Sequence, residues 1–122
     1  MHETDDTGLD ALLDLDGEVY RFDDGYWVKF ECLRVVADVN SPHGISYSLT
    51  LHDRHNKRVV GFDNAHACPP PSRKKYAGRQ VTWDHRHPDY KIRAVQYEFE
   101  SPARLIEDFW AEVDRVMGRE SR

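Results

Sequence analysis

The sequence predicts an α+β fold, in which an antiparallel, meander-like β-sheet of about five to seven strands is covered on one face by a single C-terminal amphipathic helix. Along several short segments, apolar and polar residues alternate between turn residues, which is typical of strands with one buried face. Near the C-terminus the apolar spacing changes to three and four, the period of an amphipathic helix. A one-sided sheet and such a helix can bury their apolar faces against each other, which favours two layers.

The length of the chain predicts one domain. Its 122 residues are close to the commonest single-domain size, and 11% of them are aromatic, which supplies large burial per side chain. We expect this domain to cover 9–118, with a flexible acidic segment at 1–8 and a flexible tail at 119–122. No apolar run approaches the ~20 residues that span a bilayer, and the acidic first residues do not resemble a secretory signal.

The first part of the chain is predicted to form hairpins. Segments 12–15 and 18–22 flank Asp16-Gly17, a pair suited to a two-residue turn, so we expect a first hairpin there. The next strand is expected at 26–39, where the apolar phase shifts over 33–36 and indicates a β-bulge.

The clearest strand is predicted at 45–52, and 58–63 is expected to pair with it after a polar turn. The alternation of the first of these strands is the cleanest in the chain, with inward positions at Ile45, Tyr47, Leu49 and Leu51.

The second half contains a long loop before two further strands. Segment 64–81 is expected to be irregular, because Pro69-Pro70-Pro71 removes three amide donors. Long loops in compact domains are often functional. Short strands are predicted at 81–87 and at 94–100.

The C-terminal helix has clear start and stop signals. Ser101 can cap its N-terminus, Pro102 suits its first turn, and Gly118 can end it.

The two cysteines do not predict a disulfide framework. Cys32 and Cys68 are too few and too far apart for a disulfide-rich scaffold, so we expect two reduced thiols in a cytoplasmic protein.

Charge is distributed unevenly. A net charge of -5 argues against a protein dominated by phosphate contacts, but residues 1–24 hold nine carboxylates and one cation, so the body is mildly basic. Between residues 72 and 93 seven basic residues face two acidic ones and are interleaved with aromatic residues, which suits a phosphate-facing stretch. The alternative is a solvated loop whose cations balance the acidic N-terminus.

Two polar motifs carry the candidate chemistry. Asp63-Asn64-Ala65-His66 ends one predicted strand, and Trp83-Asp84-His85-Arg86-His87 lies on another. If the second motif is extended, His85 and His87 share one face, with Asp84 and Arg86 on the other. Two different chemistries suit this arrangement.

The first chemistry is metal binding. His85 and His87, with His66 or Asp63, could supply three ligands to zinc or a similar ion and leave a position for water. No Cys-x-x-Cys or His-Glu-x-x-His pattern reinforces this reading, so we expect no cofactor and keep a divalent ion as an alternative.

The second chemistry is metal-free cleavage of RNA, in which one imidazole removes the 2′-hydroxyl proton and another group protonates the leaving 5′-oxygen. The candidates for the catalytic groups are His66, His85, His87 and Asp63. The candidates for phosphate binding are Arg86, Arg79, Lys74 and Lys75. Alternatively, the two histidines of the second motif are ordinary strand residues, and Asp63-Asn64 forms a turn.

These motifs and the helix after Ser101, in this order, resemble the TumE family of toxin-antitoxin proteins over most of residues 18–117. The resemblance rests on Phe62-Asp63-Asn64-Ala65-His66 and on Asp84-His85-Arg86-His87. The family motifs are richer, resembling Asp-Asn-Ala-Pro-His-His and Pro-His-His-Lys-His. The present chain lacks the proline and one histidine of the first motif and has Asp84 where the second has histidine, which puts a metal site using those groups in doubt.

The resemblance implies a growth-inhibiting prokaryotic toxin that is neutralised by a helix-turn-helix antitoxin protein and acts on RNA in the cytoplasm. The competing hypothesis is a non-catalytic module that binds nucleic acid or protein through the basic 72–93 stretch.

Overall fold

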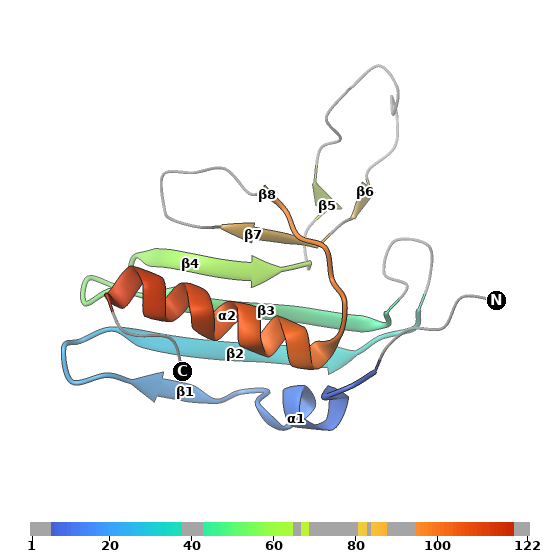
Figure 1. Cartoon of the computed structure of the whole chain (residues 1–122), viewed down its shortest axis with the longest axis horizontal. Helices are drawn as coiled ribbons and strands as arrows, with labels where there is room; N and C mark the ends of the chain where they lie inside the picture. Colours follow the sequence, from blue (N-terminus) through green and yellow to red (C-terminus); the bar gives the residue numbers. More distant parts are fainter. Residues whose placement is uncertain are drawn as a thin grey trace, which may run out of the picture.

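The computed structural model describes residues 6–37, 43–64, 67–68, 81–82, 84–87 and 95–118, and for 67, 68, 81, 82 and 85 it describes the backbone. The helices and strands, shown in Figure 1, are α1 (Leu9–Asp14), β1 (Val19–Arg21), β2 (Trp27–Arg34), β3 (Ile45–His52), β4 (Arg58–Asp63), β5 (Ala67–Cys68), β6 (Val81–Thr82), β7 (His85–His87), β8 (Val95–Gln96) and α2 (Pro102–Met117).

The strands form a six-stranded sheet in the order β1-β2-β3-β4-β7-β8, and β5 pairs with β6 in a second, two-stranded sheet. Each of these pairs is antiparallel. Helix α2 lies across one face of the larger sheet, over β2, β3 and β4 (Figure 1). The predicted α+β class and the single covering helix are therefore confirmed.

The core lies between α2 and the sheet. Register places Phe30, Leu49 and Phe62 in one row across β2, β3 and β4, and each is buried. The ring of Phe109 from α2 lies 5.4 Å from that of Phe30 and 6.1 Å from that of Phe62, both edge-to-face. The predicted inward positions of β3 are all buried: Ile45, Tyr47, Leu49 and Leu51.

Helix α2 begins and ends where its sequence signals predict. The Ser101 hydroxyl accepts a hydrogen bond from the Arg104 amide, and Gly118 ends the helix in the left-handed conformation at φ 69°. Among the described residues no helix is both long enough and apolar enough to cross a membrane.

The predicted first hairpin is wrong, because 12–15 does not form a strand and α1 occupies Leu9–Asp14 instead. An apolar pattern over four residues fits a helix as well as a strand. Here tertiary packing decides: Leu12 is buried in the core, and the Ala103 amide donates to the Thr7 carbonyl at 2.8 Å, which ties the start of α1 to α2.

The predicted bulge at 33–36 is also wrong. β2 pairs with β3 without a shift as far as Arg34, and the apolar side chains that suggested a change of phase are exposed: Leu33 by 55%, Val35 by 39% and Val36 by 88%.

A register shift occurs instead between β3 and β4. Leu51 pairs with Val60 but His52 pairs with Arg58, so an advance of one residue on β3 corresponds to an advance of two residues on β4, and Val59 is the extra residue. Val59 and Val60 both pack toward the core as a result.

The two late strands are shorter than predicted. The 81–87 segment forms two strands in different sheets, β6 and β7, and the 94–100 strand ends after Gln96. Tyr97, the next residue, still donates its amide to the Asp84 carbonyl at 3.0 Å, and its hydroxyl donates to Asp108 of α2 at 2.7 Å. β5 at Ala67–Cys68 lies within the segment predicted to be irregular.

Candidate active site

The two polar motifs meet because β4 and β7 are neighbours in the sheet. Asp63 pairs with His85 and Gly61 pairs with His87. Paired residues of adjacent strands share a face, and Phe62, between Gly61 and Asp63, points to α2. Gly61 and Asp63 therefore face the other side, which we call the polar face. Its described side chains include Thr50, His52, Asp63 and His87.

Asp63 and His87 are in direct contact on the polar face. Oδ2 of Asp63 lies 3.4 Å from Nε2 of His87, with 4% of the aspartate side chain and 16% of the histidine side chain exposed. A buried carboxylate beside a partly accessible imidazole can orient the ring and determine which nitrogen carries the proton. The carboxylate in this arrangement positions the imidazole and does not itself need to exchange a proton. The backbone of His85 pairs with Asp63 beside it.

Arg58 belongs to the same cluster and was not predicted from the sequence. A Cβ atom added to Gly61 would lie 3.3 Å from Cδ of Arg58 and 3.4 Å from Cδ2 of His87, so both side chains pass over this glycine. Strict alternation would put Arg58 on the opposite face from Gly61, but the register shift in β4 reverses the phase between them. The sequence showed a strand starting at Arg58 and no signal of the shift.

Asp84 of the second motif lies on the helix side, in a buried cluster of its own. It accepts a hydrogen bond from the Tyr47 hydroxyl at 2.8 Å and lies 2.9 Å from Nε2 of His43. Nδ1 of His43 accepts from the Ile45 amide at 3.1 Å, so both ring nitrogens are engaged and the proton is on Nε2. Burial, with Asp84 nearby, raises the pKa of Tyr47 far above its usual range. This cluster holds the start of β3 in place.

Arg86 also lies on the helix side, where its guanidinium is 3.6 Å from Glu112 of α2. The structure therefore does not bring Arg86 to Asp63 and His87.

Asn64 of the first motif extends the pairing of β3 and β4. Its side-chain oxygen accepts from the Tyr47 amide at 2.9 Å, and its side-chain amide donates to the Ile45 carbonyl at 2.7 Å. The residue is 5% exposed. These bonds fix the point at which the chain leaves the sheet, directly after Asp63.

Several predicted site residues lie outside the described residues, namely His66, Lys74, Lys75 and Arg79, as does the side chain of His85. Among the side chains that the structure does describe, no three His, Cys, Asp or Glu groups gather closely enough to hold a metal ion.

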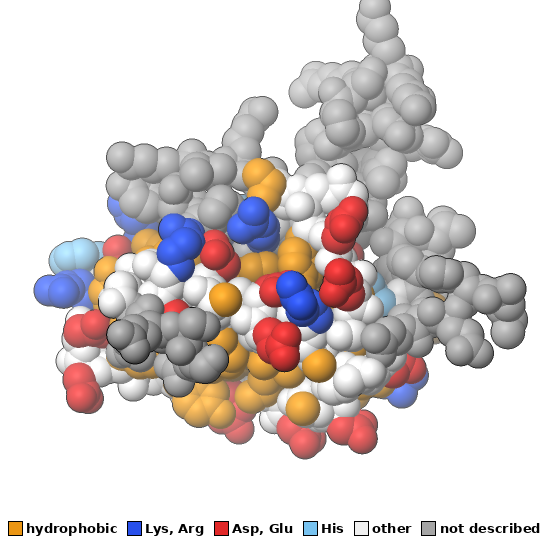
Figure 2. Space-filling model, viewed as in Figure 1, with side chains coloured by type: hydrophobic (Ala, Val, Ile, Leu, Met, Phe, Trp, Pro, Cys, Tyr) orange, Lys and Arg blue, Asp and Glu red, His pale blue; other side chains and the backbone are white. Residues whose placement is uncertain are grey.

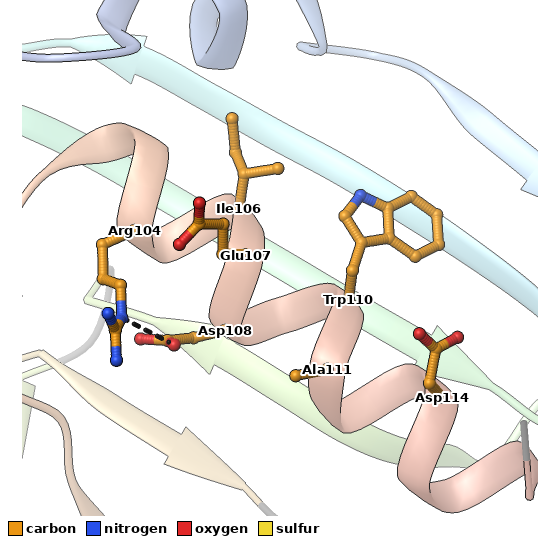
Figure 3. A pocket seen from close by; sticks show the side chains of 7 residues that line it. All are labelled: Arg104, Ile106, Glu107, Asp108, Trp110, Ala111 and Asp114. Atoms are coloured by element: carbon orange, nitrogen blue, oxygen red, sulfur yellow. Dashed lines mark hydrogen bonds and ion pairs between the residues drawn. The ribbon is translucent and has the colours of Figure 1, made fainter. Parts of the chain in front are cut away.

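A cavity of about 480 Å³ lies on the other side of the molecule, along α2. Figure 3 shows that its lining side chains all come from this helix, and they are Arg104, Ile106, Glu107, Asp108, Trp110, Ala111 and Asp114. Acidic and basic side chains are intermixed over the helix on this face of the molecule (Figure 2). No described residue of either polar motif lines this cavity, and the candidate active site is the cluster on the polar face.

Comparison with known proteins identifies a family of similar sequences. The model of the family described as Toxin TumE matches residues 5–117, which is nearly the whole chain. No curated protein and no solved structure matches.

Proposed function

The chain belongs to the Toxin TumE family and is therefore a toxin component of a toxin–antitoxin system, and from this premise we propose that it acts by cleaving RNA at the polar face. His87 and His85 exchange the protons, Asp63 positions His87, and Arg58 stabilises the charge on the phosphate.

The contact between Asp63 and His87 is the observation that carries this proposal. Its carboxylate is 4% exposed and 3.4 Å from the imidazole, so it is held in a fixed position beside a ring that solvent reaches. Because Nε2 faces Asp63, Nδ1 is the nitrogen that acts on the substrate.

In the proposed reaction, Nδ1 of His87 takes the proton of an RNA 2′-hydroxyl, and the resulting oxygen attacks the adjacent phosphorus. The bond between phosphorus and the 5′-oxygen breaks, which leaves a 2′,3′-cyclic phosphate and a 5′-hydroxyl. His85, as the imidazolium, supplies the proton of that hydroxyl. One proton is removed and one is delivered, so the step balances without a co-reactant. The Arg58 guanidinium stabilises the negative charge that grows on the phosphate oxygens.

The test combines growth with product analysis. Expression of the wild-type protein without an antitoxin should arrest growth, and the purified protein should release RNA fragments with 2′,3′-cyclic phosphate ends. His87→Ala and Asp63→Asn should each lower the cleavage rate by on the order of 100-fold. His55→Ala changes an exposed histidine in the β3–β4 turn and is the matched control, which should behave as wild type.

Unchanged toxicity of both variants would overturn the catalytic proposal. A non-catalytic module that binds through the basic 72–93 stretch would then be the better account.

Metal dependence is tested in the same assay. We expect cleavage to persist in the presence of a chelator. Loss of cleavage that added Zn²⁺ restores would instead support an ion held by His66, His85 and His87.

Phosphate binding extends to the 72–93 stretch in this proposal. Lys74, Lys75 and Arg79 are the proposed contacts, and their replacement by glutamine should weaken RNA binding and make it less dependent on salt. Equal salt dependence in wild type and variant would argue against these contacts.

The family implies an antitoxin partner. We propose that this partner is a helix-turn-helix protein and that both act in a prokaryotic cytoplasm. Co-expression of the two proteins should restore growth, and growth arrest that continues in the presence of their complex would contradict this part of the proposal.

A further inference from the structure

A row of four side chains crosses the polar face from β1 to β4. Register pairs Arg21 with Trp27, Trp27 with His52, and His52 with Arg58. Directly paired residues project to the same side of a sheet and lie side by side. All four side chains end in planar groups, two of them aromatic rings and two guanidinium groups. We call these four residues the stacking row.

The centre of the stacking row is a stacked aromatic pair. The rings of Trp27 and His52 have centroids 4.1 Å apart and planes inclined by 11°. The Trp27 indole donates to the side-chain oxygen of Asn56 at 3.1 Å, and Nε2 of His52 lies 3.0 Å from the Thr50 hydroxyl. The pair is therefore held in one orientation before any ligand arrives.

The His52 ring is neutral in this setting. Burial lowers the pKa of His52 and is the largest effect; a hydrogen bond with the Asn56 backbone opposes it, the positive charges of Arg58 and Lys29 lower the pKa further, and Asp53 raises it slightly. A neutral imidazole offers a flat face for stacking and does not repel the Arg58 guanidinium beside it.

The face of Trp27 that points away from His52 is covered loosely. Arg21 comes from β1, on the opposite side of β2 from His52, and its guanidinium carbon lies 5.7 Å from the indole centroid. This distance is near the outer limit for a cation–π contact. Because Arg21 is exposed, its side chain can move outward and then cover a flat group that has inserted against the indole.

Arg58 connects the stacking row with the candidate active site. It pairs with His52 at the end of the row, and its side chain passes over Gly61 next to His87. A polymer bound along the stacking row would therefore pass the Arg58 guanidinium before it contacts His87 and Asp63.

We propose that the stacking row binds a base of single-stranded RNA and holds the nucleotide next to the bond that is cleaved, an inference that rests on the function proposed above. Proteins that bind single strands combine aromatic faces for the bases with positive charges for the phosphates, and this row has both. A base inside a duplex keeps its faces against its neighbours, so the row selects unpaired RNA.

The experiment measures RNA affinity where cleavage does not occur. The full-length His87→Ala variant is titrated into a fluorescein-labelled single-stranded RNA of mixed sequence, followed by fluorescence anisotropy. Adding Trp27→Ala should weaken binding on the order of 10-fold, the loss of one stacked base. Trp27→Phe keeps an aromatic face and should retain most of the affinity. Arg21→Gln should lower the salt dependence by about one phosphate contact.

Tyr20→Ala is the matched control, because Tyr20 is an aromatic residue on β1, is 44% exposed, and faces α2 rather than the polar face. It should leave affinity unchanged, and circular dichroism should show the same fold for every variant. Equal RNA affinity with and without Trp27→Ala would overturn the inference. So would equal affinity for the single-stranded RNA and for a duplex of the same sequence, or no detectable binding of the single strand.

The binding and cleavage results separate the two proposals. Binding that depends on Trp27 in a protein that never cleaves RNA supports the stacking row and overturns the proposed chemistry. Cleavage by wild type, with affinity and KM unchanged by Trp27→Ala, overturns the row and leaves the proposed chemistry in place.

Discussion

The imidazole of His87 lies over Gly61, with its Cδ2 atom 3.4 Å from the point where a Cβ atom of residue 61 would stand. Arg58 approaches the same point to 3.3 Å. The missing side chain of Gly61 is what allows a cation and an imidazole to lie side by side at the candidate active site.

Gly61→Ala should therefore impair activity more than stability. A methyl group would displace His87 or Arg58 by a few tenths of an ångström, and misplacement of catalytic groups is costly, so we expect RNA cleavage to fall on the order of 10-fold. The thermal unfolding midpoint should stay close to that of wild type.

Gly17→Ala should give the opposite pattern. Gly17 has φ 83° and no neighbour within 4 Å of an added Cβ, so alanine strains the backbone, lowers stability by about 1 kcal/mol and leaves cleavage unchanged. A cleavage rate equal to that of wild type in Gly61→Ala would contradict the proposal that the position of His87 over Gly61 is important for activity.

Because of Cys32, the free energy of unfolding should decrease as the pH rises through the alkaline range. Its thiol donates to the Leu12 carbonyl at 2.9 Å, and burial, reinforced by the carboxylate of Asp16, raises the pKa of Cys32 from 9.0 to about 11. A raised pKa in the folded state favours the protonated thiol, so its contribution is complete below pH 9 and is lost as pH rises from 9 toward 11.

Urea unfolding of two proteins measures this effect: the Cys68→Ser variant, and the same variant with Cys32→Ala added. The difference in unfolding free energy between the two proteins should shrink between about pH 8 and about pH 10. A difference that stays constant over this range would contradict the assignment.

Loss of the α2 cap should destabilise the fold moderately. The Ser101 hydroxyl accepts from the Arg104 amide at 3.2 Å and is largely buried, so Ser101→Ala should lower the free energy of unfolding by about 1 kcal/mol. Ser101→Asp retains an acceptor and should keep most of the stability. Chemical denaturation distinguishes the two, and equal losses would mean that the hydroxyl does not act as a cap.

Truncation of Phe109 should be the most damaging change in α2. Its ring is buried between those of Phe30 and Phe62, and Phe109→Ala should cost about 3–5 kcal/mol, much of the total stability of a typical domain. Glu107→Ala, at an exposed position of the same helix, should change stability by less than about 0.5 kcal/mol. Similar melting temperatures for the two variants would contradict the prediction that the Phe109 ring contributes strongly to the stability of the core.

The fold could be predicted wherever a local pattern was long or had a specific cap. β3 and α2 satisfy this condition: the first alternates over its full length, and the second begins at Ser101 and ends at Gly118. Residues 12–15 were predicted wrongly because four residues do not distinguish the two periods, and packing of Leu12 against the core decides between them.

The candidate site could be predicted in part. The sequence predicted a site formed by the two motifs together, and the pairing of β4 with β7 does bring Asp63 and His87 into contact. It could not indicate Arg58, whose face depends on an irregularity in pairing, nor Trp27, whose role depends on its neighbours in adjacent strands. Both are relations between strands, which periodicity within one strand does not encode.

The irregular pairing at the start of β4 has a consequence for how this hairpin tolerates change in length. Deleting Val59 would remove the extra residue, so Arg58 would directly precede Val60, alternate regularly with it and still pair with His52 on the polar face. Regular pairing with Val59 kept would instead place Val59 opposite His52 and turn Arg58 toward the hydrophobic core. The hairpin can therefore lose its extra residue and keep the bridging guanidinium, but it cannot keep that residue and lose the shift.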